Sequence, residues 1–258
     1  MLAYPNIDPV LLHLGPLQIR WYGIAYVAGI FLGMRLAVSS FRRLGLSRDA
    51  IWDFPSYLVS GILLGGRLIY VAVYDPGYFI AHPLQIFAIW QGGMAYHGAA
   101  LGAVVATGLY SRRYLISIWP LLDVLGWAST IGIGFGRLAN FINGELYGRV
   151  GEVPWAMVFP DAGNLPRHPS QLYEALGEGL LLFILLSLFR RKLDLEPGQL
   201  FSCYLMGYGA IRFVIEFFRE PDLQVGYWFG ALTTGQLFCA LMVLAGAICY
   251  RIRAVKAS

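Results

Sequence analysis

Charged side chains are scarce in this sequence. Asp, Glu, Lys and Arg supply 13% of the 258 residues, whereas about 25% is typical of soluble globular domains. Hydrophobic residues supply 58%, so too few polar side chains remain to cover a water-exposed globule of this size. The composition excludes a disordered chain, a coiled coil and an ordinary soluble enzyme, and it indicates that lipid surrounds most of the surface.

Cysteine is also rare, and the motifs of several common chemistries are missing. The 3 cysteines, Cys203, Cys239 and Cys249, lie in apolar runs and form no C-x-x-C pair, so we expect no disulfide framework. The sequence lacks a Gly-rich phosphate loop, an H-E-x-x-H motif, a G-x-S-x-G elbow and paired aspartates for Mg²⁺. We therefore expect no metal and no cofactor. The basic residues form no stripe interleaved with aromatics, so nucleic acid is not an expected partner.

Long hydrophobic runs are abundant instead. A helix needs about 20 mainly apolar residues to cross a bilayer. The sequence predicts an all-α integral membrane protein with about seven transmembrane helices, at Trp21–Ser40, Phe54–Tyr74, Gly92–Tyr110, Pro120–Asn140, Leu172–Phe189, Leu200–Phe218 and Trp228–Tyr250. Nothing indicates a second domain, so residues 1–258 are expected to form a single polytopic membrane domain.

The segment before the third span carries no charge. Asp, Glu, Lys and Arg are absent between Pro76 and Ser111, a stretch too long for one simple span. We interpret its first part, up to about Gln91, as an interfacial or re-entrant segment. The predicted break is at Gly92-Gly93, since paired glycines interrupt helices.

The basic residues indicate an orientation. Most of the 19 lysines and arginines follow the odd-numbered spans, namely Arg42, Arg43, Arg48, Arg112, Arg113, Arg190, Arg191, Lys192, Arg251, Arg253 and Lys256. By the positive-inside rule, the N-terminus is then outside and the C-terminus cytoplasmic. The connection 144–171 would lie outside as a small extracytoplasmic loop or cap, with little helix because it contains several prolines.

Ionisable side chains inside apolar spans are costly, so each suggests a partner or a function. Arg67 lies deep in the second span, and it could pair with Asp123 or with a carboxylate on the sixth span. The sequence does not decide between these partners.

The densest polar cluster follows the fourth span. In a helix, Arg137 and Asn140 share a face, and Asn143 comes three residues later, followed by Glu145. The end of a helix with polar caps does not explain a guanidinium beside two amides and a carboxylate. These four residues are therefore candidate site residues.

The sixth span also carries a group of polar and charged residues. Its helical periodicity places Tyr208, Arg212, Glu216 and Arg219 on one face of an apolar helix. An ion pair between Arg212 and Glu216 is the structural alternative, but it leaves the other two residues unexplained.

Two inward-facing arginines from different spans predict an anion held between helices, because a guanidinium binds phosphate through two parallel donors. In a membrane, the abundant anion with an apolar body is a phospholipid.

Three further positions have both a structural and a functional interpretation. His97, in a Gly-rich uncharged segment, is equally compatible with packing and with catalysis. Tyr22 opens the first span, where it could belong to an interfacial aromatic belt or present its hydroxyl to a lipid head group. The run 167–174, which contains His168, is typical of a loop-to-helix junction, with Ser170 as a possible N-cap and Glu174 in the first turns, and a structural role is favoured for this run.

These segments resemble the bacterial prolipoprotein diacylglyceryl transferases along the whole chain and in the same order. The runs that carry the resemblance are Trp21-Tyr22-Gly23, Gly92–Gly98, Gly136–Glu145 with Gly148-Arg149, His168–Glu174, and Arg212 with Glu216–Asp222. No departure from the family pattern occurs at these positions. Five separate motifs make the resemblance specific.

The resemblance implies a multi-pass enzyme of the bacterial cell (inner) membrane, with an active site that opens outward and toward the lipid. It implies transfer of the diacylglyceryl group of phosphatidylglycerol to the thiol of the lipobox cysteine in a prolipoprotein, with release of glycerol phosphate. The expected partners are thus phosphatidylglycerol and a prolipoprotein signal peptide. We expect a monomer.

The resemblance also assigns site residues. The expected catalytic residues are Arg137, Arg212, His97 and Tyr22. The expected substrate-binding residues are Asn140, Asn143, Glu145, Tyr208, Glu216 and Arg219, of which Asn143 is added from its spacing alone. Either glutamate could hold an arginine in position. Whether His97 takes the proton of the thiol, or the arginines alone lower the pKa of the thiol, is left open.

Two other classes of function use the same sequence features. A non-enzymatic carrier or channel for an anionic lipid would bind its cargo with the same arginines. A structural membrane scaffold would tolerate the loss of Arg137 and of Arg212.

Overall fold

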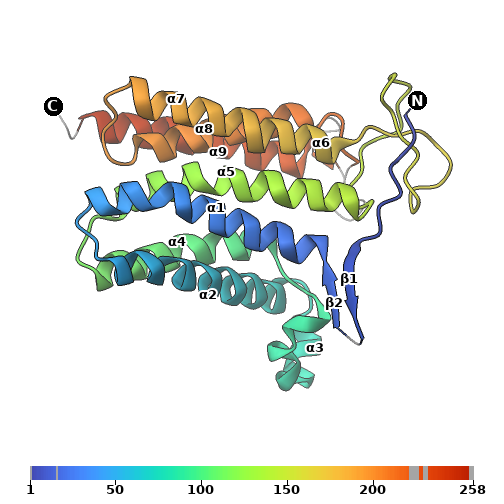
Figure 1. Cartoon of the computed structure of the whole chain (residues 1–258), viewed down its shortest axis with the longest axis horizontal. Coiled ribbons are helices and arrows are strands. Elements are labelled where there is room, and N and C mark those ends of the chain that lie inside the picture. The colour runs from blue at the N-terminus through green and yellow to red at the C-terminus, as the bar shows by residue number, and fades with distance from the viewer. Residues whose placement is uncertain (1, 16, 221–226, 229–231, 256–258) are drawn as a thin grey trace. The chain divides into compact units, whose positions relative to one another are not determined.

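The computed structural model consists mainly of helices (Figure 1). It describes residues 2–15, 17–220, 227–228 and 232–255. The chain folds into two compact units. Residues 1–36 and 123–258 form what we call the discontinuous unit, and residues 37–122 form the inserted unit.

The discontinuous unit contains most of the helices. In chain order its elements are β1 (Val10–Leu14), β2 (Leu17–Arg20), α1 (Trp21–Arg43, which runs on into the inserted unit), α5 (Ile118–Ile142, whose first residues belong to the inserted unit), α6 (Ser170–Glu174), η3 (Ala175–Leu181), α7 (Leu182–Lys192), α8 (Gln199–Ile215), β3 (Tyr227–Trp228), β4 (Leu232–Thr233) and α9 (Thr234–Val255). The strands form two antiparallel pairs, β1 with β2 and β3 with β4. Helix α8 lies beside both α7 and α9 (Figure 1).

An apolar core fixes the helices that carry the candidate site. It contains Trp127 of α5, Leu182 and Leu186 of α7, and Leu200 and Tyr208 of α8, all buried. Because protein cores are close-packed, such a cluster fixes the spacing of its helices. Polar side chains on α5 and α8 are therefore held at defined positions.

The inserted unit is built on a pair of closely packed helices. Its elements are α2 (Arg48–Val73), α3 (Pro76–Ala81), η1 (Pro83–Phe87), η2 (Ile89–Gln91) and α4 (Tyr96–Arg113). Helix α2 begins where the Ser47 hydroxyl accepts a hydrogen bond from the amide of Ala50, at 3.2 Å, as an N-cap does.

Glycines allow α2 and α4 to approach each other closely. A Cβ atom at Gly65 would lie 2.8 Å from the Cα atom of Gly102, and a Cβ atom at Gly102 would overlap the carbonyl oxygen of Gly61. Small residues at helix contacts are the usual way for membrane helices to associate, because lipid gives little hydrophobic drive for helix association. The α2–α4 pair is such a contact.

We expect Gly102→Ala to destabilise the protein, by about 1–3 kcal/mol, because the added methyl group has no room in a packed contact. Gly108→Ala is the matched control on the same helix, since a Cβ atom there would lie 3.7 Å from the Ile118 side chain, an ordinary contact. The measurement is thermal unfolding in detergent. Equal unfolding midpoints for the two variants would contradict the expectation.

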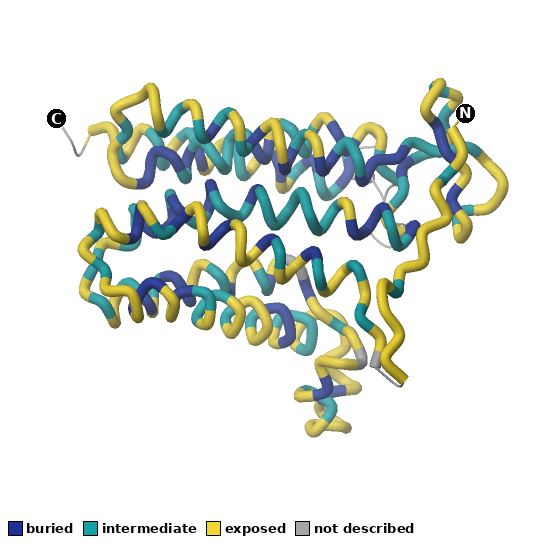
Figure 2. Tube along the Cα trace, viewed as in Figure 1, coloured by how far each residue is buried: buried dark blue, intermediate teal, exposed yellow. Residues whose placement is uncertain are grey.

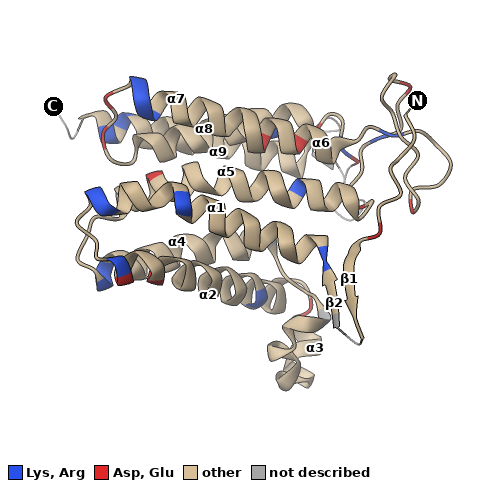
Figure 3. Cartoon of the chain, viewed as in Figure 1, with Lys and Arg blue, Asp and Glu red and all other residues tan. Residues whose placement is uncertain are grey.

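The composition of the helices fits a membrane protein. Among the described residues, five helical stretches are long and apolar enough to cross a bilayer, namely Trp21–Arg43, Arg48–Val73, Ile118–Ile142, Ser170–Lys192 and Thr234–Val255, and Gln199–Ile215 is a shorter apolar helix. Many of their large apolar residues are exposed, and Figure 2 shows exposed residues along the length of several of these helices. Charged residues are concentrated at helix ends and in loops (Figure 3). The protein is therefore a multi-pass membrane protein, and the predicted class is confirmed.

Each of the seven predicted spans overlaps a helix, but some boundaries differ. Helix α9 begins at Thr234, later than Trp228, because Thr233 and Gln236 exchange hydrogen bonds that cap it at 3.0 and 3.2 Å. Helix α8 ends at Ile215, earlier than predicted, where the backbone tightens into a turn. The break at Gly92-Gly93 was predicted correctly, since both residues have positive φ. The short strands were not predicted.

Candidate functional site

Two buried glutamates lie at the centre of the candidate site. Glu174 ends α6, and Glu178 follows four residues later in η3, a π-helical turn. Both are fully buried, with 0% of each residue exposed. Because an ionised carboxylate is costly to remove from water, such residues need cationic partners. A π-helical turn within an α-helix is rare and often marks a functional site.

Three arginines supply those cations. Nε of Arg137, on α5, is 3.1 Å from Oε2 of Glu174, and its Nη2 is 3.5 Å from Oε2 of Glu178. Nη1 of Arg212, on α8, pairs with Oε1 of Glu174 and is 3.3 Å from Oε1 of Glu178. Nη1 of Arg219, just beyond α8, is 3.0 Å from Oε1 of Glu174. The two acids therefore hold arginines from separate helices side by side.

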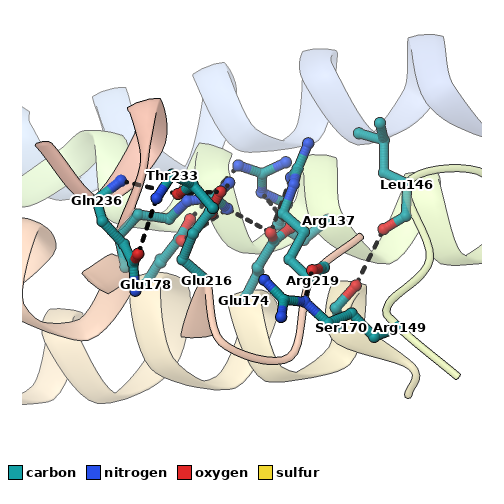
Figure 4. Close-up of polar contacts among 11 residues, drawn as sticks. Arg137, Leu146, Arg149, Ser170, Glu174, Glu178, Glu216, Arg219, Thr233 and Gln236 are labelled. Carbon is teal, nitrogen blue, oxygen red and sulfur yellow. Dashed lines mark hydrogen bonds and ion pairs between the residues drawn. The ribbon is translucent and has the colours of Figure 1, made fainter. Parts of the chain in front are cut away.

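A third carboxylate completes the group. Oε2 of Glu216 is 3.0 Å from Nη2 of Arg212, one helical turn earlier, and its Oε1 accepts a hydrogen bond from the Thr233 hydroxyl at 3.2 Å. Figure 4 shows these side chains converging between the helices. We call the six residues Arg137, Arg212, Arg219, Glu174, Glu178 and Glu216 the acid–arginine cluster.

The cluster balances its own charge but retains donors for another anion. Its three arginines face three carboxylates, which offsets the cost of burying ions. The arginine side chains keep 18%, 13% and 14% exposure for Arg137, Arg212 and Arg219. Within the described residues, Nη1 of Arg137 donates no hydrogen bond, and the ion pairs with Glu174 and Glu178 are made by Nε and Nη2. It can therefore donate to an oxygen of an incoming anion.

A second polar group extends from the same helix. Asn140 and Asn143 donate their side-chain amides to Oε1 of Glu145, at 2.8 and 3.2 Å. The Tyr22 hydroxyl contacts Asn140 and lies 3.2 Å from the hydroxyl of Tyr26. The Oδ1 atom of Asn143 is buried and accepts no hydrogen bond from the described residues. Glu145 thus orients two amides, and one of them presents a vacant acceptor.

The loop between α5 and α6 holds the chain that follows α8. Nε of Arg149 donates to the carbonyl of Arg219 at 2.8 Å, and Nη1 of Arg167 pairs with Glu220 at the same distance. One main-chain bridge joins Gly148 to Arg219 as well. This loop therefore fixes the backbone from which the Arg219 side chain reaches the cluster.

The junction between this loop and α6 has the predicted form, but the predicted cap is wrong. Pro169 occupies the N-cap position, and Ser170 is already helical, so its hydroxyl instead donates to the carbonyl of Leu146 at 3.0 Å. Nδ1 of His168 lies 3.0 Å from the Tyr173 hydroxyl. Burial lowers the pKa of His168, which favours its neutral form at neutral pH.

The structure brings most of the predicted site residues into one unit. Four belong to the acid–arginine cluster, namely Arg137, Arg212, Glu216 and Arg219, and four to the second group, namely Tyr22, Asn140, Asn143 and Glu145. Tyr208 is buried on α8 in the same unit. His97 is the second residue of α4, in the inserted unit, and it is exposed.

The charged residues Asp123 and Arg67 have other partners than those considered from the sequence. Asp123 accepts main-chain hydrogen bonds from Gly198 and Phe201, both at 2.7 Å, so it links the start of α5 to the start of α8. Arg67 pairs with no carboxylate of the described residues and is held by main-chain carbonyls. Neither of the two pairings left open from the sequence is made, because a full set of neutral acceptors satisfies Arg67.

Glu178 was missed in the sequence, and Glu174 was interpreted as structural. Both lie at or within the fifth predicted span, where the run 172–189 is otherwise apolar. An acidic residue in the middle of such a run is a functional candidate by default. That signal, together with the i, i+4 spacing of the two glutamates, identifies a pair facing one side of the helix.

Comparison with known proteins identifies the family of the chain. The chain matches the model of the family described as prolipoprotein diacylglyceryl transferase over residues 9–252. It is 46% identical to the phosphatidylglycerol–prolipoprotein diacylglyceryl transferase of Methylocella silvestris, over all of this chain and 99% of that protein. The proteins of the same name from Geobacter sulfurreducens and Pseudomonas paraeruginosa are 44% and 46% identical, covering 95% of this chain and 95% and 93% of theirs. The chain therefore belongs to the prolipoprotein diacylglyceryl transferase family.

Proposed function

We propose that this chain transfers the diacylglyceryl group of phosphatidylglycerol to a cysteine thiol of a prolipoprotein, and that the acid–arginine cluster binds the phosphate of the lipid. The sulfur attacks the glyceryl carbon that carries the phosphate, and a carbon–sulfur bond forms as the carbon–oxygen bond breaks. Glycerol phosphate leaves with the electron pair of that bond. The proton of the thiol goes to a base, and the product is a thioether.

One observation carries this proposal. Arg137 and Arg212 come from separate helices, yet both pair with Glu174 and Glu178. Two arginines on separate outer surfaces would have removed the basis for a shared phosphate site. Their common carboxylates instead hold both guanidinium groups at one place among apolar helices.

The arginines act most strongly as the leaving group forms. A phosphate diester carries one negative charge, and the departing phosphate monoester gains a second. Donors that are already in place therefore stabilise the transition state more than the ground state. Glu174 and Glu178 act by holding the donors of Arg137 and Arg212 in position before the lipid arrives.

The second polar group suits the glycerol head group of the lipid. That head group carries hydroxyls, which donate hydrogen bonds, and Oδ1 of Asn143 is a buried acceptor without a donor among the described residues. Asn140 and Tyr22 lie beside it. Glu145 fixes both amides and so sets which atom faces the head group. Tyr208, on the same helix as Arg212, is assigned to the same binding role.

Two routes remain for the thiol proton. In the first, His97 acts as the general base, since imidazole is the usual proton acceptor near neutral pH. In the second, the arginines lower the pKa of the thiol, because cationic neighbours stabilise the thiolate. Replacing His97 by Gln separates the two, since only the first route loses its base.

The proposal includes an arrangement in the membrane. The chain forms one polytopic, monomeric domain in the bacterial inner membrane, with the N-terminus and the loop 144–171 outside and the C-terminus in the cytoplasm. The basic residues at the ends of α7 and α9 support this orientation. The cluster then lies toward the outer side, where a secreted prolipoprotein presents its cysteine.

The direct test uses the purified protein, phosphatidylglycerol and a peptide with a lipobox cysteine. We expect the peptide to gain the mass of a diacylglyceryl group minus one hydrogen, and glycerol phosphate to appear in equal amount. A serine replacing the cysteine in the peptide is the control and should gain nothing. Lipid binding without product would contradict the enzyme and favour the non-enzymatic carrier.

A further inference from the structure

Arg67 is a buried cation that the proposed reaction does not use. It lies on α2 with 6% of its surface exposed. Its Nε donates to the carbonyl of Ile86 at 2.8 Å, and its two terminal nitrogens donate to four further carbonyls, those of Gln85 at 2.6 Å, Ala88 at 3.5 Å, Gly92 at 2.6 Å and Gly93 at 2.9 Å. All these acceptors belong to the chain between α3 and α4.

These contacts occupy the whole guanidinium group. Arginine has five N–H donors and no acceptor, and five carbonyls receive them. The rings of Phe79 and Tyr70 lie 5.1 and 5.9 Å from the Cζ atom of Arg67, where their faces attract a cation. Arg67 therefore has no donor left for a phosphate, in contrast to Arg137.

Two glycines make this arrangement possible. Gly92 and Gly93 have φ angles of +85° and +76°, which residues with a Cβ atom rarely adopt. A Cβ atom at Gly93 would lie 2.7 Å from Nη1 of Arg67 and 2.6 Å from the Tyr70 ring, whereas a Cβ atom at Gly92 would meet nothing within 4 Å. The backbone turn at Gly93 is thus closed tightly around the guanidinium.

The turn held by Arg67 leads directly into α4. The amide of Ala95 donates to the carbonyl of Gly66, the neighbour of Arg67 on α2, at 2.9 Å. Helix α4 starts at the next residue, and His97 is its second. Two adjacent residues of α2 therefore fix the backbone on which the first turn of α4 is built.

We infer that Arg67 is a positioning residue for His97. It holds the turn at residues 92–95 by its main-chain contacts, and this turn fixes where α4 begins and where His97 projects. The inference rests on the proposed role of His97 as the base. Positioning errors of about 1 Å cost an enzyme about 100-fold in rate, so a loosened turn acts mainly on kcat.

The first test compares Arg67→Met and Arg67→Lys in the transferase assay. We expect kcat to fall about 100-fold in Arg67→Met, with the KM for phosphatidylglycerol within about threefold of the parent, because all the donors of Arg67 are already used. Arg67→Lys should recover only part of kcat, since an ammonium group has three donors. An unchanged kcat, or a loss confined to KM, would overturn the inference.

The paired glycines supply a matched control. Gly92→Ala and Gly93→Ala both place a Cβ atom on a residue with positive φ, but only the latter collides with Arg67. We expect Gly93→Ala to lose about tenfold more kcat than Gly92→Ala, and to add little further loss to Arg67→Met, because substitutions that break one contact are not additive. Equal losses in the two glycine variants, or full additivity, would contradict the inference.

Hydrogen exchange separates this inference from the proposed base. In Arg67→Met, the amides of Gly92 and Ala95, which donate to the carbonyls of Ile89 and Gly66, should exchange at least about tenfold faster, since the local structure that protects them opens more readily. Unchanged exchange shows that Arg67 does not hold the turn, whatever the role of His97. Faster exchange together with full activity in His97→Gln shows that the turn is held but that the proposed base is wrong, and it overturns the positioning role.

Discussion

Arg212→Ala and Arg137→Ala are each expected to abolish measurable transfer. Each arginine supplies donors to the charge that develops on the leaving phosphate, and loss of one such donor group costs about 100- to 1000-fold in kcat. Each loss also leaves Glu174 and Glu178 with one cation fewer, which disturbs the remaining arginine as well. The measurement is the initial rate of diacylglyceryl addition to the lipobox peptide, followed by mass spectrometry.

Lysine variants separate a catalytic loss from a folding defect. Arg137→Lys and Arg212→Lys keep the positive charge beside the buried glutamates, so the fold should persist, but a lysine cannot provide two parallel donors. We expect both to stay folded and to remain at least about 100-fold slower than the parent. Arg35→Lys, at an exposed position of α1, is the matched control and should keep full activity. Full activity in both site variants would remove the phosphate site from the proposal.

The membrane class of the fold can be predicted from the sequence because bilayer thickness fixes helix length. Runs such as 21–40 and 120–140 correspond to α1 and α5 to within a few residues at each end. The pairing of Arg212 with Glu216 can also be predicted from the sequence, since i, i+4 spacing places two residues on one face of any helix. These features depend on local geometry alone.

The remaining features depend on the meeting of distant segments. Glu174 lies 38 positions before Arg212 in the chain, and nothing local indicates that it bonds Arg212 and Arg219 together. The partners of Arg67 are main-chain carbonyls, which every residue has, so no side-chain pattern can reveal them. The π-helical turn that carries Glu178 is a departure from regular geometry that sequence periodicity does not report.

The charge balance of the cluster links its stability to its function. Three arginines and three glutamates are close to neutral as a group, so the empty site is stable without an anion. A bound phosphate adds negative charge and competes with the carboxylates for the same donors. The glutamates therefore stabilise the free protein and limit how tightly it binds the lipid, and removing one of them should affect the two properties in opposite directions.

Glu174→Gln is expected to cause the largest loss of stability, about 3 kcal/mol, because it leaves three arginines without their shared carboxylate. Glu178→Gln, which breaks contacts with two arginines, should cost less. Glu220→Gln is the control, since its pair with Arg167 has a 42% exposed carboxylate and such pairs are worth less than about 1 kcal/mol. Thermal unfolding in detergent ranks the stabilities of the three variants.

Binding of phosphatidylglycerol tests whether the loss of Glu174 increases the affinity of the cluster for the lipid. A ligand that binds only the folded state raises the unfolding midpoint, and at a given concentration a tighter ligand raises it more. Since Glu174→Gln leaves more positive charge for the phosphate, added phosphatidylglycerol should raise the unfolding midpoint of this variant more than that of the parent. Phosphatidylcholine, which is zwitterionic, is the control and should change the two midpoints equally. If Glu174→Gln is as stable as Glu220→Gln, or gains no more from phosphatidylglycerol than the parent does, the carboxylate does not compete with phosphate for these arginines.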